Sequence, residues 1–462
     1  MNKISLKKIF SGYGADLTQG SIRKHLVLFS MPMLLGNAFQ VGYGIVNALW
    51  VGNGLGPKDL AALTVSFSVY YVLIAVAAGL TLATSILAAQ AYGAKDMKQL
   101  RRVANNSVLL IIGISLMCLI AGSLLSQELL VLLHTPADLL PLAKSYLRIL
   151  LLATPFLFGM FLVASLLRGV GDSITPLYFQ GAAILITAVL DPLLMFGWLG
   201  FPRLGLNGTA YGTIFAHILM LLALLYYIGK KKHIASPDWR CLGMDRETSI
   251  LTMKIGLPYM LQQTLVAAGT VAIVGLVNKF GSDSTAAYGI TMRVDLLAMM
   301  PGSTIGMAVS TLTGQNIGAR RFDRVRKVFW NGLVLSCGMT LAVSALALII
   351  PGFVMRLFVT DPGVIAIGTL YLRILAVGYL FFAITFVSNG IINGSGNTFA
   401  TTMFTLVSLW VVRIPLAAYL VRLTGKVESI WVAILISFAL LTIVSLAYYA
   451  RGPWQRSIVK PL

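Results

Sequence analysis

Twelve long apolar segments recur along this chain, and they constrain its fold more than any other feature. Each is long enough for an α-helix to cross the ~30 Å hydrocarbon core of a bilayer. Because the segments show no alternation of apolar and polar residues, they predict helices and not the strands of a barrel. They lie at about 25–50, 60–88, 104–125, 140–167, 175–197, 206–229, 250–276, 285–312, 329–352, 365–392, 398–422 and 428–450.

The composition excludes a water-soluble protein. Of the 462 residues, 58% are hydrophobic and 11% are charged, and the mean hydropathy is +0.87. A chain with this small share of charged residues cannot keep a whole surface in contact with water. Lipid must therefore surround most of the chain. A cytosolic enzyme, a secreted disulfide-rich protein and a disordered chain are therefore excluded.

Basic residues predict the orientation in the membrane. Lys and Arg outnumber Asp and Glu by 35 to 15, which gives a formal charge of +20. They lie in short loops and not in a stripe that follows a phosphate backbone, so no nucleic-acid partner is expected. The termini and alternate loops hold 24 of them, whereas the other loops hold Lys58, Arg203, Lys279, Arg356, Arg422 and Lys426. The sequence thus predicts a multi-pass protein of the cytoplasmic membrane with both termini in the cytoplasm.

The second half of the chain repeats the first at an offset close to 225 residues. We expect an all-α fold of twelve transmembrane helices in two homologous six-helix bundles, related by a pseudo-two-fold axis along the membrane normal. The corresponding stretches are 30–32 and 256–258, 89–94 and 314–319, 146–150 and 371–375, and 168–172 and 393–397. The expected parts are a cytoplasmic N-terminal segment (1–24), an N-lobe (25–229), a cytoplasmic linker (230–249), a C-lobe (250–450) and a cytoplasmic tail (451–462).

The duplicated bundle favours transport over other membrane functions. Two similar bundles form a seam that opens toward either side when they rock, as alternating access requires. Channels and membrane enzymes also arise by duplication, so this pattern leaves them open. The sequence has no GxxxxGK or HExxH motif and no Ser/His/Asp grouping, so no enzyme and no cofactor is expected, and energy must come from an ion gradient or from a partner. Cys118, Cys241 and Cys337 lack the spacing of metal ligands, and no metal site is predicted.

Asp191 is the most informative residue inside a span, because it directly precedes Pro192. A charge at a helix centre costs about 2.5–3.5 kcal/mol in lipid, so it needs a function or a partner. The proline frees a backbone carbonyl one turn earlier, so acid and carbonyl would line one polar pocket. Exchange of a proton or a cation is one interpretation, and an ion pair with Arg148 or a helix-end cap is the other.

Asp295 is the second acid inside a span. Arg293 lies two positions away, and residues at that spacing do not share a helix face. Its partner is therefore expected to be Arg373 or Arg413, in a structural pair or in a gate. The basic residues inside the spans, to which we assign structural roles, are Arg148, Arg293, Arg373 and Arg413.

Neutral polar residues follow one face of the first span, because Asn37, Gln40, Tyr43 and Asn47 are three, three and four positions apart. Such a stripe either lines a cavity or joins helices by hydrogen bonds. The seventh span offers a similar group. Gln262 and Gln263 of that span supply neutral polar contacts. Adaptable side chains suited to varied aromatic cations, which are also common in plain packing, are Tyr259 and Met260 on the seventh span and Met299 on the eighth.

Taken together, these stretches resemble the multidrug and toxic compound extrusion (MATE) transporters, and among them the DinF-like branch, over nearly the whole chain. The matching stretches are Val46–Gly52, Leu190–Pro192, Gly256–Pro258, Arg293–Pro301, Gly314–Ala319 and Arg413–Pro415. The resemblance implies an antiporter that exports amphipathic, often cationic compounds in exchange for protons or sodium ions. It also implies two six-helix lobes around a central cavity that function as a monomer in the lipid bilayer.

The resemblance places the N-lobe carboxylate of the fifth span on Asp191. The family's other N-lobe carboxylate, on the first span, falls at Asn47, which cannot titrate. A single-acid site is therefore expected, in which Asn47 and Tyr43 assist together with Thr187 or Thr213. The seventh-span acid of some relatives is also absent here. An alternative cargo is a lipid-linked precursor, which a cavity densely lined by arginine would favour.

Overall fold

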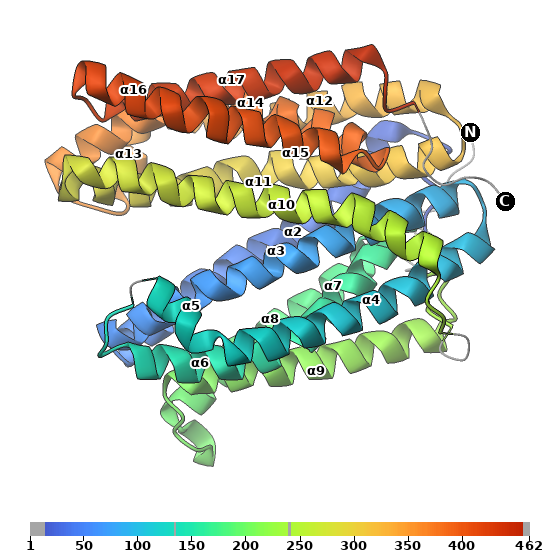
Figure 1. Ribbon diagram of the computed structural model, residues 1–462, viewed down its shortest axis with the longest axis horizontal. Coiled ribbons are helices and arrows are strands. Elements are labelled where there is room, and N and C mark those ends of the chain that lie inside the picture. The colour runs from blue at the N-terminus through green and yellow to red at the C-terminus, as the bar shows by residue number, and fades with distance from the viewer. Residues whose placement is uncertain (1–13, 134, 239–241, 456–462) are drawn as a thin grey trace. The chain divides into compact units, whose positions relative to one another are not determined.

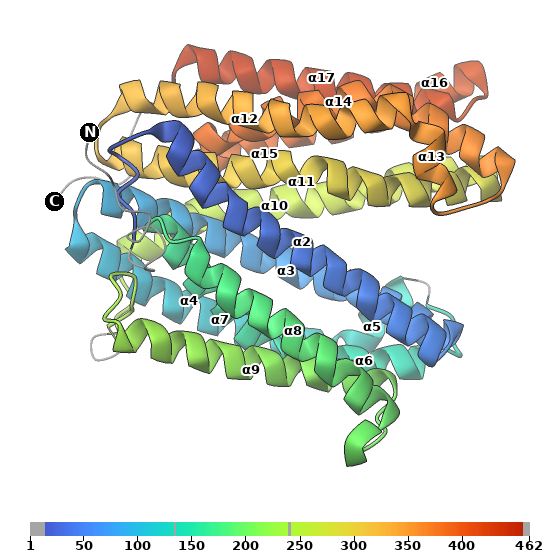
Figure 2. The same cartoon turned by 180° about the vertical axis from the view of Figure 1, so that it is seen from behind.

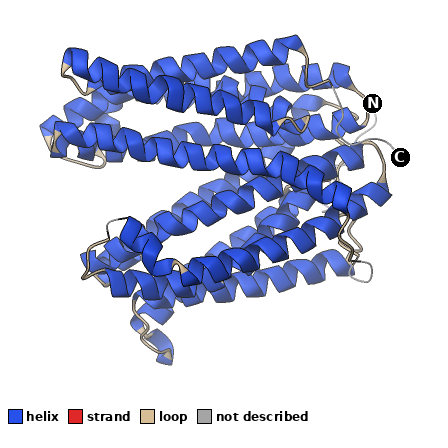
Figure 3. Cartoon of the chain, in the orientation of Figure 1, coloured by secondary structure: helices blue, strands red, loops and turns tan. Residues whose placement is uncertain are grey.

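The computed structural model describes residues 14–133, 135–238 and 242–455, and every regular element in these ranges is a helix (Figure 3). The helices of the first half are α2 (Ile22–Gly54), α3 (Pro57–Gly93), α4 (Met97–Leu124), α5 (Ser126–Leu132), α6 (Leu140–Leu152), α7 (Thr154–Gly169), α8 (Ile174–Phe196), η1 (Trp198–Gly200) and α9 (Leu206–Lys230). Those of the second half are α10 (Arg246–Val277), η2 (Asn278–Phe280), α11 (Ser282–Gly318), α12 (Phe322–Ile349), α13 (Pro351–Arg356), α14 (Pro362–Gly394), α15 (Thr398–Leu406), η3 (Val407–Arg413), α16 (Ile414–Thr424) and α17 (Glu428–Arg451) (Figure 1).

The predicted twelve transmembrane helices are confirmed for the described residues. Eleven helices are long and apolar enough to cross a membrane, and α6 with α7 makes the twelfth if this pair is one span. Large apolar side chains remain exposed on these helices, including Leu185 at 69%, Val271 at 71% and Val334 at 69%. Exposure of this kind fits surfaces that lipid covers, because water would not tolerate so many.

Two spans are not single regular α-helices. The fourth bends by 45° between α6 and α7, where Pro155 in the first turn of α7 lacks the N–H that would continue the helix. The eleventh contains a π-helical turn, η3, and Pro415 lies in the first turn of α16, which follows it. A turn of this type breaks the regular hydrogen-bond ladder and is frequent at functional sites.

The chain forms two compact units, which are described separately. Unit 1 comprises residues 1–16 and 31–256, and unit 2 comprises residues 17–30 and 257–462. These bounds differ from the expected lobes, 25–229 and 250–450, because the start of α2 belongs to unit 2 and the start of α10 belongs to unit 1. Parts of the expected N-terminal segment, linker and tail (1–13, 239–241 and 456–462) lie outside the described residues.

Hydrogen bonds explain why the start of α2 belongs to unit 2. The backbone N–H of Leu17 donates to Gln315 Oε1 at 3.0 Å, and Arg23 Nε donates to Asn331 Oδ1 at 2.8 Å. In unit 1, Asn106 Oδ1 on α4 accepts from the Ser249 hydroxyl of α10 at 2.8 Å. The start of α2 is thus bound within unit 2, and the start of α10 is bound within unit 1.

The cores of the two units are built from different helices. In unit 1, buried side chains of α3, α6 and α9 pack together, with Leu147 and Leu151 fully buried. In unit 2, α11, α14 and α17 form a core in which Tyr379 and Trp431 are fully buried. The helices α8 and α9 run side by side along unit 1 (Figure 2), which places the fifth-span acid against α9.

Candidate functional site

The Asp191 carboxylate lies buried in unit 1, with 1% of the residue exposed. The Tyr43 hydroxyl of α2 donates to Asp191 Oδ2 at 2.9 Å. Asn47, one turn further along α2, donates from Nδ2 to the Tyr43 oxygen at 3.4 Å. The predicted polar face of the first span therefore reaches the fifth-span acid through a short chain of hydrogen bonds.

Two buried oxygen atoms in this cluster have no hydrogen-bond partner among the described residues. They are Asp191 Oδ1 and Asn47 Oδ1. Both can only accept, and buried polar atoms in proteins are nearly always paired. The cluster is therefore two donors short of full pairing, and a cation could take the place of a donor.

No arginine neutralises this acid in the described part of the chain. None of the ion pairs found there involves Asp191. Arg148 is exposed, and its Nε donates to the Ser126 hydroxyl at 3.1 Å. The alternative of a fixed ion pair between Asp191 and Arg148 is wrong, because α6 directs the guanidinium toward α5.

Glycine on α9 brings the backbone of that helix close to the acid. A Cβ atom added at Gly212 would lie 3.0 Å from Asp191 Oδ1, and one at Gly208 would lie 2.7 Å from the Leu194 carbonyl carbon. These glycines are four positions apart, the spacing that lets two membrane helices approach closely. Gly212, which the sequence reasoning missed, forms the wall beside the unpaired oxygen, and the GxxxG spacing was the signal that could have found it.

The two predicted threonines lie on the helices that carry the acid and its glycine wall. Thr187, one turn before Asp191, donates its hydroxyl proton to the Ala183 carbonyl at 2.8 Å. Thr213 donates to the Thr209 carbonyl at 2.9 Å. With their protons engaged in their own helices, both hydroxyls can offer only lone pairs to a neighbour.

The remaining first-span residues lie further from the acid along α2. Asn37 is half-buried, whereas Gln40 is exposed. The structure thus brings Tyr43 and Asn47 of the predicted stripe to Asp191 and leaves Gln40 outside the hydrogen-bonded cluster.

In unit 2, two tyrosines of α14 hold the Asp295 carboxylate of α11. The Tyr371 hydroxyl donates to Oδ2 at 2.5 Å, and the Tyr379 hydroxyl donates to Oδ1 at 2.6 Å. The expected ion pair with Arg373 or Arg413 is absent from the described residues. Arg373 is exposed, because it lies two positions from Tyr371 and therefore on a different face of α14.

The four arginines inside the spans lie on four different helices. Arg148, Arg293 and Arg373 are exposed on α6, α11 and α14. Arg413 on η3 donates from Nε to the Ser437 hydroxyl at 2.6 Å and lies over the Phe438 ring at 4.7 Å. This distribution gives no support to a dense arginine lining for phosphate headgroups.

Aromatic rings pack around Tyr371 beside the Asp295 carboxylate. Trp431 stacks on Tyr288 with 5.3 Å between ring centroids and meets Tyr371 edge-on at 4.8 Å. The sequence reasoning missed the two tyrosine donors. The signal available was the repeated Tyr-Leu-Arg-Ile-Leu stretch, which contains Tyr371.

Gln262 of the seventh span contacts α15. Gln262 Nε2 donates to the Thr405 hydroxyl at 2.8 Å, and its Oε1 is buried without a partner among the described residues. Gln263, Tyr259 and Met260 are half-buried on the same helix. Met299 packs against the core of unit 2.

The two halves carry their acids on different helices. At the repeat offset of 225, Asp295, Tyr371 and Tyr379 correspond to Tyr70, Tyr146 and Thr154. Those three residues of unit 1 are buried and include no acid. In the described ranges, no group of three or more His, Cys, Asp or Glu side chains could hold a metal ion.

A single family model, MatE, matches the chain twice, at residues 32–193 and 258–419. The chain belongs to the MatE family. The two MatE matches lie 226 residues apart, which confirms the duplication. As a member of this family the protein is a membrane transporter and not an enzyme. The narrower assignment to the DinF-like branch stays a prediction.

Relatives of this MatE chain match over nearly their whole length. It is 34% identical to the probable multidrug resistance protein YpnP of Bacillus subtilis, with 95% of this chain and 97% of that protein covered. It is 32% identical to the probable multidrug resistance protein YoeA of the same organism, with 96% of each covered. A MATE family transporter solved in an outward-facing conformation is 23% identical, covers 95% of this chain and 97% of its own, and has a TM-score of 0.89, which shows a shared fold.

Proposed function

We propose that the protein is a secondary antiporter that exports amphipathic, often cationic compounds in exchange for protons or sodium ions by alternating access. The names of two full-length relatives, both probable multidrug resistance proteins, support this cargo. The observation that carries the proposal is the buried Asp191 carboxylate, which has one oxygen hydrogen-bonded and the other unpaired among the described residues.

Asp191 binds the coupling cation in this proposal. A buried carboxylate without a counter-charge is costly in a low-dielectric interior, so a cation that neutralises it stabilises the conformation in which the acid is buried. The Tyr43 hydroxyl holds Oδ2 and leaves Oδ1 for the cation. A cationic compound that competes for the same negative charge would displace the coupling ion, and this competition links the two flows.

Neutral oxygens complete the coupling site. Asn47 stands where the family carries a second acid, and its unpaired Oδ1 offers an acceptor without a charge. Thr187 and Thr213 offer hydroxyl lone pairs, because their protons are bound to their own helices. A proton needs only the Asp191 oxygen, whereas a sodium ion would draw on these neutral oxygens as well.

The substrate contacts are proposed along the first and seventh spans. Asn37 and Gln40 extend the α2 face, and Gln262 and Gln263 with Tyr259 and Met260 extend that of α10. Asp295 and Met299 were predicted for the same cavity. For Asp295 a structural role is favoured instead, because two tyrosine hydroxyls already satisfy its oxygens.

The proposed location is the cytoplasmic membrane, with both termini in the cytoplasm and the chain active as a monomer. The excess of basic residues in alternate loops supports this orientation. A reporter fused to either terminus should then be accessible only from the cytoplasmic side.

The deciding experiment reconstitutes the purified protein in liposomes with an imposed pH or sodium gradient, while a panel of fluorescent cations is followed. We expect the wild type to export the cations with one of the two gradients, which identifies the coupling ion. The Asp191→Asn variant should be produced and inserted into the membrane normally, but its gradient-driven efflux should be abolished. Asp138→Asn is a matched control, because Asp138 lies in a loop, 61% exposed, paired with Lys58. Undiminished efflux by Asp191→Asn would remove this residue from the mechanism.

A further inference from the structure

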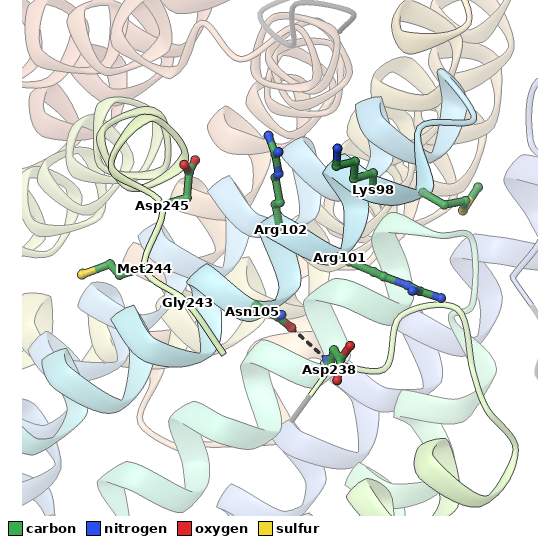
Figure 4. Close-up of a pocket in the computed structure, with 9 residues that line it drawn as sticks. Lys98, Arg101, Arg102, Asn105, Asp238, Gly243, Met244 and Asp245 are labelled. Carbon is green, nitrogen blue, oxygen red and sulfur yellow. Dashed lines mark hydrogen bonds between the residues drawn. The ribbon is translucent and has the colours of Figure 1, made fainter. Parts of the chain in front are cut away.

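A pocket of about 670 Å³ lies in unit 1 between the start of α4 and the chain that leads into α10 (Figure 4). One wall is the first two turns of α4, with Lys98, Arg101, Arg102 and Asn105. These residues are at positions i, i+3, i+4 and i+7, so they share one helix face. The volume is within the range of sites that bind small ligands.

The basic wall carries positive charge that no ion pair neutralises in the described ranges. Lys98, Arg101 and Arg102 are exposed, and none lies within ion-pairing distance of an acid there. Two acids, Asp238 and Asp245, also line the pocket. Three cations against two acids leave the lining with a net positive charge.

Asp245 is already engaged by its own helix. It accepts from the Thr248 hydroxyl at 2.5 Å and from the Thr248 N–H at 2.8 Å, as the residue that caps α10. The hydrogen bond from the Thr248 side chain, more than the nearby Arg102 charge, lowers the pKa of this acid. Its carboxylate therefore serves the helix end and is not directed to a guanidinium.

The second wall is held against α4 by hydrogen bonds. Asn105 Oδ1 accepts from the Asp238 N–H at 2.9 Å, a bond drawn in Figure 4. Asn106 Oδ1 accepts from the Asp245 N–H at 3.2 Å and from the Ser249 hydroxyl at 2.8 Å. The pocket is thus built by side chains of α4 that fix both ends of the opposite wall.

Apolar side chains sit at the edges of this charged pocket. Met97 is 39% exposed and Met244 is 64% exposed, and both line it. The pocket also lies where α4 begins its passage through the apolar core, on the side that we propose is cytoplasmic. Anionic headgroups of the inner leaflet concentrate at this depth and attract Lys and Arg.

We propose that this pocket binds a phosphate group, either that of an anionic lipid headgroup or free phosphate. Arginine suits this chemistry, because its planar guanidinium donates two parallel hydrogen bonds to phosphate oxygens. The lipid would also place its glycerol and acyl portions against the two methionines. Binding would hold the segment before α10 on α4.

The second half provides a matched comparison. At the repeat offset, Lys98, Arg101, Arg102 and Asn105 correspond to Asp323, Arg326, Lys327 and Trp330. An acid therefore replaces the first cation, and a large ring replaces the asparagine that binds the opposite wall. Removing two charges at Arg326 and Lys327, both exposed, changes the net charge equally without touching the pocket.

The test measures thermal unfolding of the purified full-length protein in detergent at constant ionic strength. Dioctanoyl phosphatidylglycerol, dioctanoyl phosphatidylcholine and inorganic phosphate are titrated separately. We expect phosphatidylglycerol to raise the melting temperature of the wild type and of Arg326→Gln/Lys327→Gln. Each basic residue near the membrane surface changes affinity about five-fold, so Arg101→Gln/Arg102→Gln should bind about 25-fold more weakly.

The two sources of phosphate give different results. Stabilisation by phosphatidylglycerol alone assigns the lipid headgroup, and equal stabilisation by inorganic phosphate, with competition between the two, assigns free phosphate. The proposal is overturned if phosphatidylcholine stabilises as strongly as phosphatidylglycerol, or if both double variants lose the effect equally. If Arg101→Gln/Arg102→Gln does not unfold cooperatively, Lys98→Gln gives the same test with one exposed charge.

Discussion

Replacing Gly212 by alanine tests the atom that we assign to the coupling cation. The added methyl group would lie 3.0 Å from Asp191 Oδ1 and 3.4 Å from Leu190 Cβ. The first distance is tighter than almost all Cβ contacts in proteins, so the carboxylate or the helix must move by a few tenths of an ångström. The substitution therefore perturbs the unpaired oxygen while the carboxylate itself is retained.

The expected loss of stability is small and the expected loss of coupling is large. Overpacking costs about 1–3 kcal/mol, whereas alanine gains about 0.8–1.0 kcal/mol over glycine within a helix, so unfolding should be easier by about 0–2 kcal/mol. If the carboxylate turns away, it loses the hydrogen bond from Tyr43, which is worth about 1.5–3 kcal/mol because the acceptor is charged. Without that hydrogen bond, the affinity of Asp191 for its cation should rise tenfold or more, and slow release would impair coupling.

The assay combines gradient-driven efflux in proteoliposomes with thermal unfolding in detergent. Gly229→Ala is the matched control, since it makes the same substitution in α9 at a position where an added Cβ meets nothing within 4 Å. We expect Gly229→Ala to couple like the wild type and to unfold at or above the wild-type temperature, whereas Gly212→Ala should lose coupling while it still unfolds cooperatively, within about 2 kcal/mol of the wild type. Equal coupling by the two variants would refute the assignment of Asp191 Oδ1 as the cation ligand.

Three further predictions concern hydrogen bonds to carboxylates. Tyr43→Phe removes the hydroxyl that donates to Asp191 and stabilises its negative charge, so the acid should bind its cation about tenfold more tightly and release it more slowly. The measurement is the efflux rate as a function of the cation concentration on the opposite side of the membrane. Tyr379→Phe leaves Asp295 Oδ1 unpaired, which should lower the free energy of unfolding by about 1–3 kcal/mol without abolishing efflux. The Thr248 side chain lowers the pKa of Asp245, so this acid stabilises the fold above its unfolded pKa of about 4 and loses that contribution as pH falls through its lower folded pKa. Melting temperatures recorded across pH 3–6 should therefore fall less steeply for Asp245→Asn than for the wild type.

The spans were predictable because lipid makes hydrophobicity a continuous signal along each helix. The start of α8 and the end of α9 fall within about a residue of the predicted segments, 175–197 and 206–229. The bend at Pro155 was not predicted, since proline is tolerated inside membrane helices and also interrupts them. Which of these outcomes holds depends on packing against neighbouring helices, and the sequence does not show that packing.

The exchange of helix starts between the units was also beyond the sequence. The repeated stretches ending in Pro32 and Pro258 marked equivalent points in the two halves, and each lies within two residues of the place where the helix passes from one unit to the other. The repeat could not indicate which residues bind the start of each of these two helices. That depends on long-range hydrogen bonds such as the one from Arg23 to Asn331, which join residues 308 positions apart.

The contrast between the two acids carries the functional argument. Repetition of the chain would place equivalent acids at equivalent positions, yet Asp191 and Asp295 lie on non-equivalent helices. Asp295 has a tyrosine hydroxyl on each oxygen, so its hydrogen-bonding capacity is largely used within unit 2. Asp191 has one tyrosine donor and a glycine beside its second oxygen, which has no partner among the described residues. A carboxylate that must bind and release a cation in each cycle needs such an incomplete set of partners, because donors on every oxygen would compete with the ion for the same lone pairs.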